Sequence, residues 1–180
     1  DGQDRLHALI NEKPNNIYIS FDEFVSVCEG GGSFPELIVM EYLPGEEYSV
    51  DVLVDNGKYI SAIPRSRDHI KMGISFVGTV VDDREIIDYS KRIVEGLKLN
   101  GNIGFQLKRE INGIPKVIES NPRVQGTIVL CTAAGENMVY EAVKACLGEK
   151  IEKPDIVWGL KMIRYWEELF LDKNGNKVDF

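Results

Sequence analysis

Residues 104–123 read GFQLKREINGIPKVIESNPR, and this stretch decides the fold because it predicts a β-hairpin. Asn112-Gly113 lies between two runs with alternating apolar residues. This pattern is typical of a two-residue type I′ turn, in which both central residues adopt positive φ. Such a turn sets the register of the two strands, so that Gln106 would lie directly opposite Glu119 and Gly104 opposite Asn121.

The predicted hairpin gathers three polar side chains on one face, those of Gln106, Glu119 and Asn121. Side chains alternate along a strand, and cross-strand neighbours lie about 5 Å apart at Cβ. Amide and carboxylate oxygens without Cys or His suit a hard cation such as Mg²⁺, whose remaining ligands are usually waters and substrate phosphates. Arg123 follows with a positive charge suited to phosphate. Spacing alone leaves an alternative open, a solvated hairpin face with one acid and two amides.

Composition sets the bounds on the rest of the chain. The 180 residues are 43% hydrophobic, enough for one sizeable core or two small lobes of a soluble globular protein. The net charge of -8 argues against nucleic acid or an anionic membrane as partner, but not against a nucleotide bound with its metal.

The cysteines indicate the cellular compartment, and the first residue bears on whether the chain is complete. Cys28, Cys131 and Cys146 form no CxxC pair, and no apolar stretch approaches the ~18 residues of a membrane span. A reducing cytoplasm fits this pattern best. Asp1 is not a natural start, so we expect the chain to be a piece of a longer protein.

Short helical and extended segments alternate along the chain. Because the extended segments form hairpins and meanders, we expect an α+β fold, an antiparallel sheet with helices packed on one side, rather than a doubly wound parallel sheet. A capping box of Asp82 and Glu85 is expected to begin a helix that ends near Asn100. The other expected helices span 4–12, 22–28 and 136–147, and the other expected strands span 37–40, 48–54, 58–63 and 160–171.

Three separate stretches together resemble one known family. Residues 40–51 read MEYLPGEEYSVD, Gln106 follows later, and residues 119–123 have the pattern Glu-x-Asn-Pro-Arg. In this order they resemble the ATP-grasp superfamily, in particular its carbamoyl-phosphate-synthase-like branch. The resemblance covers roughly residues 38–137. It implies that residues 38–180 are the C-terminal lobe of an ATP-grasp domain, with an adenine linker and a metal-binding hairpin, and that residues 1–37 are a remnant of the preceding lobe.

The resemblance assigns nucleotide contacts to the stretch before the first long strand. It implies that the backbone of Glu41 and Leu43 binds the adenine edge, where side-chain identity matters little, and that Pro44 and Gly45 turn the chain away. Glu47 would hold the ribose hydroxyls, because a carboxylate can accept two O–H bonds from a vicinal diol. The alternative for Glu47 is an ordinary surface acid.

The same resemblance implies that Gln106 and Glu119 bind Mg²⁺, with Glu119 bridging two ions and Asn121 completing the second; Mn²⁺ would suit the same ligands. Arg123 would steady an acyl phosphate, because its planar fork of donors matches phosphate oxygens. Glutamine in place of an acid at position 106 lowers the charge of the site and weakens its affinity for metal. Arg65 would reach the γ-phosphate or an anionic substrate, and a place in a solvated loop is its alternative.

Parts of the family pattern are absent from this chain. No glycine-rich strand pair followed by a lysine precedes Ile38, so the lid over the phosphates is expected in N-terminal regions in cis or on another chain. Acceptor specificity is expected in the loops 65–76 and 125–131, where Arg67 is expected to be solvated.

The expected function is that of a ligase. In the full-length parent, ATP would phosphorylate a small-molecule carboxylate or carbonate, and an amine or ammonia would then displace phosphate; the piece alone would be inactive. Two alternatives remain open, a phosphoryl transferase without ligation and a nucleotide-binding domain without catalysis.

Overall fold

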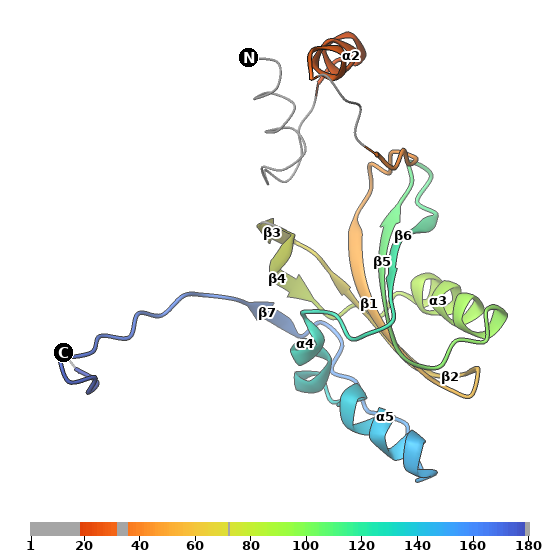
Figure 1. The fold of residues 1–180 in the computed structure, drawn as a ribbon. Coiled ribbons are helices and arrows are strands. Elements are labelled where there is room, and N and C mark those ends of the chain that lie inside the picture. Colours follow the sequence, from red (N-terminus) through yellow and green to blue (C-terminus); the bar gives the residue numbers. More distant parts are fainter. Residues whose placement is uncertain (1–18, 32–35, 72, 179–180) are drawn as a thin grey trace.

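The computed structural model describes residues 19–31, 36–71 and 73–178, so the helix expected over 4–12 lies outside the described residues. Two antiparallel sheets dominate these residues (Figure 1), a four-stranded sheet of order β2-β1-β5-β6 and a three-stranded sheet of order β3-β4-β7. The first sheet contains β1 (Glu47–Asp55), β2 (Lys58–Ser66), β5 (Gly101–Arg109) and β6 (Pro115–Asn121), and the second contains β3 (His69–Lys71), β4 (Ile74–Thr79) and β7 (Lys161–Ile163).

Three of the four described helices, α2, α3 and α5, begin where a capping side chain accepts from one of the first N–H groups. The side chain of Asp83 caps α3 (Arg84–Gly96) by accepting from the N–H of Ile86, so the expected cap at Asp82 is wrong by one residue. Asn137 caps α5 (Met138–Leu147) in the same way, close to the expected start. The others are α2 (Phe21–Gly30) and α4 (Ile128–Ala133). None of the helices in these ranges is long and apolar enough to cross a membrane.

The first sheet is covered on both faces. Val50 and Val52 of β1 belong to a core with the apolar side of α3, including Ile86. On the other face Ile63 of β2 packs with α4 and with Met138 of α5, and Figure 1 shows α3 on the opposite side of the sheet from α4 and α5. The α+β class with an antiparallel sheet is therefore confirmed, but the expectation that helices pack on one side is corrected.

Two expected strands differ from the structure. Residues 37–40 lie outside every strand and are exposed, because no neighbouring strand among the described residues pairs with this apolar run. The expected strand over 160–171 is reduced to β7, which pairs with β4 only from Lys161 to Ile163. Apolar runs alone predict extended chain, but a strand also requires a partner.

The β5–β6 hairpin has a different turn from the expected one. The N–H of Glu110 donates to the carbonyl of Ile114, and Gly113 alone in the turn has positive φ, at 84°. The loop therefore has three residues and glycine in the left-handed position, a form in which Asn112 needs no positive φ. Ile118 is an extra residue in β6 that restores the register, so Gln106 still pairs with Glu119, as expected.

Candidate nucleotide and metal site

The expected metal ligands lie in the first sheet, in two neighbouring rows of residues that pair across its strands. Ser49 of β1 pairs with Gln106 of β5, which pairs with Glu119 of β6. In the next row Gly104 pairs with Asn121. Because directly paired residues project to the same side of a sheet, Gln106, Glu119 and Asn121 share one face.

The donor set of this face fits a hard cation. The amide nitrogen of Asn121 donates to Oε1 of Glu119 at 2.5 Å, which holds the two side chains together and leaves the amide oxygen of Asn121 and Oε2 of Glu119 without a partner among the described residues. The side chain of Gln106 likewise has no hydrogen bond within these ranges. In the described residues no three His, Cys, Asp or Glu side chains lie close enough together to hold a metal ion, so a site here would depend on one carboxylate and two amide oxygens.

The segment after the hairpin is held over β5. The N–H of Gln125 donates to Oδ1 of Asp51 at 2.8 Å, and its side chain donates to the carbonyl of Phe105 at 2.7 Å. A Cβ on Gly104 would lie 2.9 Å from the carbonyl oxygen of Arg123, so the backbone of Arg123 passes directly over the metal-site rows. The guanidinium of Arg123 is exposed and donates to the carbonyl of Val124 at 2.9 Å.

The expected adenine linker is tied to the turn end of the hairpin. The N–H of Gly45 donates to the carbonyl of Arg109 at 2.9 Å, and Leu43 is buried. The carboxylate of Glu41 is exposed and pairs with Lys116 of β6 at 2.9 Å. Hydrogen bonds from Lys116 to Glu41 and Glu110 raise the pKa of the lysine, which therefore stays charged. The linker backbone thus lies beside the hairpin.

Glu47, the expected ribose ligand, is paired with a cation. Its Oε1 accepts from Arg67 at 2.5 Å, which leaves the second oxygen of the carboxylate for another donor. Arg67 is not the solvated residue that the sequence predicted, because its side chain is 5% exposed. It also donates to the hydroxyl of Ser75 at 3.0 Å and to the carbonyl of Gly73 at 2.8 Å.

Arg65 lies in the interior, between β2 and α4. It is 1% exposed, forms an ion pair of 2.5 Å with Asp51 and donates to the sulfur of Cys131. Burial raises the pKa of Cys131 to about 12, so this thiol stays protonated. Arg65 pairs with Ser49 and so lies in the same cross-strand row as Gln106 and Glu119. Its guanidinium, however, is buried against Asp51 and Cys131, so neither a phosphate nor a solvated loop describes its surroundings.

A polar cavity of about 240 Å³ opens beside Gln106. Arg67 and Arg164 supply its two positive charges, and the guanidinium of Arg164 donates to the carbonyl of Gly126. Sequence reasoning missed Arg164, because no motif marks it and only the pairing of β7 with β4 brings it here. The cavity unites the two loops in which acceptor specificity was expected; its other lining residues are Ser49, Gly73, Ile74, Ser75, Gln125 and Thr127.

Comparison with known proteins agrees with this geometry. Residues 33–167, more than half of the chain, match the family model described as "ATP-grasp in the biosynthetic pathway with Ter operon". The ADP complex of PurK, N5-carboxyaminoimidazole ribonucleotide synthetase, is similar with a TM-score of 0.61 and 15% identity, over 82% of this chain and 41% of that one.

Biotin carboxylase domains are similar as well. The bicarbonate-bound domain of a thermophilic 2-oxoglutarate carboxylase matches with a TM-score of 0.53 and 16% identity, over 67% of this chain and 30% of that one. The Hydrogenobacter thermophilus domain in complex with MgADP, ADP and bicarbonate matches with a TM-score of 0.52 and 16% identity, over 67% and 29% of the two chains.

At these identities the solved structures show a shared fold, and this chain spans less than half the length of each of them. The family model, by contrast, covers most of the chain and includes both the linker and the hairpin. The chain therefore belongs to the ATP-grasp family.

Proposed function

We propose that the parent protein is an ATP-dependent ligase that phosphorylates a carboxylate or carbonate and joins it to an amine or ammonia. The observation that carries this proposal is the common face of Gln106, Glu119 and Asn121, with the backbone of Arg123 passing over it. The family supports a nucleotide-binding domain of the ligase type, and two of the similar structures contain ADP, one of them as MgADP.

Each residue of the site would contribute binding or positioning. The backbone of Glu41 and Leu43 would bind the adenine edge, and the free oxygen of Glu47 would accept from the ribose hydroxyls. Gln106, Glu119 and Asn121 would hold Mg²⁺, which when bound neutralises charge on the β- and γ-phosphates.

Arginines at two places would then act on the acceptor. Arg123 would steady the acyl phosphate that forms when a carboxylate oxygen attacks the γ-phosphorus and ADP leaves. Arg67 and Arg164 would bind the acceptor anion in the 240 Å³ cavity, because two guanidinium groups meet there beside Gln106. We do not include Arg65, since it does not line this cavity and its buried guanidinium is paired with Asp51.

The complete reaction belongs to the longer protein. A lid over the phosphates would exclude water from the acyl phosphate, and in this proposal that role would fall to N-terminal regions in cis or on another chain. Action in the cytoplasm stays a prediction from cysteine usage.

Calorimetric titration of the full-length parent with a non-hydrolysable ATP analogue, with and without Mg²⁺, tests the nucleotide and metal site. We expect binding that requires Mg²⁺ and falls at least tenfold in Glu119→Ala and Asn121→Ala, but not in Glu95→Ala, which removes an exposed acid of α3. Binding that ignores both Mg²⁺ and these substitutions would contradict the assignment.

Isotope transfer then separates a ligase from a phosphoryl transferase or a non-catalytic domain. With carboxylate acceptors or bicarbonate labelled with ¹⁸O, attack of the acceptor oxygen on phosphorus followed by displacement by an amine leaves ¹⁸O in the released phosphate. An amide or carbamate product together with labelled phosphate is expected. A stable phosphorylated product without a new C–N bond would instead identify a transferase.

A further inference from the structure

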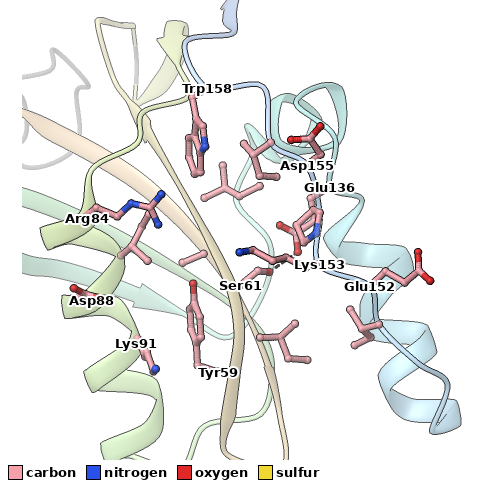
Figure 2. Close-up of a pocket in the computed structure, with 17 residues that line it drawn as sticks. Tyr59, Ser61, Arg84, Asp88, Lys91, Glu136, Glu152, Lys153, Asp155 and Trp158 are labelled. Carbon is pink, nitrogen blue, oxygen red and sulfur yellow. Dashed lines mark hydrogen bonds between the residues drawn. The ribbon is translucent and has the colours of Figure 1, made fainter.

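A second and larger cavity, of about 730 Å³, lies at the edge of the first sheet (Figure 2). It opens between α3 and the segment 151–158, with β2 as its floor. Because β2 is the end strand of its sheet, the cavity borders a strand edge that no other strand in the described part of the chain pairs with over residues 59–62. Its volume is in the range of sites that bind small molecules.

The cavity contains a buried carboxyl group with an unsatisfied oxygen. Glu136 lines it and is 3% exposed, although it is an acid in the turn between α4 and α5. One oxygen accepts from the hydroxyl of Ser61, and Oε2 has no hydrogen-bond partner in the described part of the chain. Figure 2 shows Glu136 directed from its turn toward Ser61 on the cavity floor. Buried polar atoms are almost always paired, so this oxygen is available to a donor from beyond the described residues, such as a bound molecule.

No ion pair to Glu136 forms among the described residues. Lys153 lines the same cavity, but no ion pair joins it to Glu136 in the described residues. Burial, and to a lesser degree the nearby Glu141, raise the pKa of Glu136, which shows that an uncompensated carboxylate is unfavourable there. A bound positive charge would remove this penalty.

The walls suit the body of an organic molecule rather than a bare ion. Tyr59 and Trp158 present aromatic side chains to the cavity (Figure 2), and Ile87 and Ile156 also line it. Such rings attract cations through their faces, and Lys91 already lies 5.6 Å from the ring of Tyr59. A carboxylate combined with aromatic walls is a typical arrangement for recognising an ammonium group.

The charges around the mouth do not oppose a cation. The lining contains the acids Asp88, Glu136, Glu152 and Asp155 against three basic residues, Arg84, Lys91 and Lys153. Arg84 is already paired with Asp82 at 2.9 Å. The net charge of the lining residues is therefore negative, and the net charge of the whole chain is -8.

This cavity is separate from the nucleotide and metal site. Ser61 of β2 pairs with Leu53 of β1, and Gln106 of β5 pairs with Ser49 of β1. The two sites are therefore four residues apart along β1, and β1 lies between their strands. Strand geometry puts Ser61 and Gln106 about 16 Å apart. A molecule at Glu136 could not share a bond-forming step with a nucleotide on the hairpin.

We propose that this cavity binds a small organic ammonium compound, a primary amine on an apolar or aromatic body, with Glu136 as its counter-ion. The ammonium would donate to the free oxygen of Glu136, and the body would lie against Tyr59 and Trp158. The site would act as a second ligand site, distinct from the one that binds nucleotide.

Fluorescence of Trp158 provides the test, because the chain has only two tryptophans. Trp166 is exposed and lies outside this cavity, so Trp166→Phe leaves Trp158 as the single reporter. In this background the chain is titrated with 2-phenylethylammonium and, separately, with 2-phenylethanol, which has the same body without the charge. We expect a saturable change with the ammonium and at least tenfold weaker binding of the alcohol.

Variants identify the counter-ion. Glu136→Gln keeps the shape and removes the charge, so ammonium binding should fall at least tenfold, whereas Glu152→Gln at the exposed rim should change it less than twofold. Ser61→Ala breaks the same buried hydrogen bond but keeps the carboxylate, and should keep binding. It therefore separates a lost charge from a disturbed fold, and thermal unfolding of each variant accompanies the titrations.

Three outcomes would overturn the proposal. The first is the absence of a saturable change up to about 10 mM ammonium. The binding free energy would then be weaker than about 3 kcal/mol. The second is equal binding of the alcohol, or unchanged binding in Glu136→Gln. The third is a response of Trp158 to Mg²⁺ or Ca²⁺ that depends on Glu136 while the ammonium gives none, which would assign the oxygen to an inorganic cation.

Discussion

Asp51 accepts a hydrogen bond of 2.8 Å from the N–H of Gln125, which joins β1 to the segment after the hairpin across 74 residues of sequence. The other oxygen of Asp51 is paired with Arg65 at 2.5 Å. Both side chains are buried, so one carboxylate connects β2, β1 and the segment that carries Arg123. The stability of the lobe and the placement of Arg123 should therefore depend on Asp51.

Replacing Asp51 by alanine should lower the free energy of unfolding by about 3–5 kcal/mol, because it leaves the guanidinium of Arg65 buried without a partner. Chemical denaturation monitored by circular dichroism measures this. Asp88→Ala, an exposed acid on α3, is the control and should stay within about 0.5 kcal/mol. The double variant Asp51→Ala with Arg65→Met should lose less than the sum of the two single losses, and additive losses would contradict the coupling.

Gly104→Ala should destabilise the lobe by about 1–3 kcal/mol, because the new Cβ would lie 2.7 Å from the side chain of Gln125 and 2.9 Å from the carbonyl of Arg123. Gly96→Ala is the matched control, since a Cβ there meets nothing within 4 Å in a helix, and it should be neutral or stabilising. Equal effects of the two substitutions in denaturation would show that the segment can move away from β5.

Gln106→Glu should strengthen Mg²⁺ binding by about tenfold, or about 1.4 kcal/mol, because it adds a second carboxylate to the face that carries Glu119. Calorimetric titration with Mg²⁺ and the ATP analogue in the full-length parent measures the change. Asn100→Asp adds the same charge at an exposed position outside β5 and should leave the affinity unchanged. A similar gain in both variants would indicate a general charge effect instead of ligation.

Glu136→Gln should change how stability depends on pH. Burial and Glu141 raise the pKa of Glu136 above its ordinary value of 4.5, so the folded state holds this proton more tightly than the unfolded state. As pH rises above 4.5 the unfolded chain releases the proton first, and the contribution of this group to stability decreases.

The difference in unfolding free energy between Glu136→Gln and wild type should therefore shift in favour of the variant between pH 4 and pH 7, because glutamine cannot ionise. Denaturant titrations at a series of pH values measure it, with Glu152→Gln as the exposed control. A constant difference across this range would show that Glu136 is ionised normally in the folded protein.

Local sequence patterns predicted the pairing at the metal-site face, although one step of the reasoning was wrong. Asn112-Gly113 does not form the expected two-residue turn; that geometry occurs instead at Asn56-Gly57, where φ is 47° and 78°. Gln106 nevertheless pairs with Glu119, because the extra residue Ile118 compensates for the longer loop. Register depends on both turn length and bulges, and a bulge leaves little trace in local spacing.

Burial of polar residues could not be predicted in the same way. Ser49 and Asp51 alternate with valines in β1, and both are buried. Similarly, Arg65 and Arg67 lie two residues apart in a basic cluster and were expected at the phosphates or in solvent. In the structure Arg65 is paired with Asp51, and Arg67 is paired with Glu47. Only the packing of distant segments decides whether a polar side chain meets water or a buried ion pair.

The sequence by itself determined the antiparallel pairing of the hairpin, the common face of Gln106, Glu119 and Asn121, and the family, because turn residues and strand alternation act over a few neighbouring positions. Only the tertiary structure decided that helices cover both faces of the sheet, that Arg65 is interior, that Arg164 joins Arg67 beside Gln106, and that Glu136 lies in a cavity with a free oxygen. Each of these depends on segments far apart in the chain, whose contacts are set by packing and charge pairing and not by local spacing.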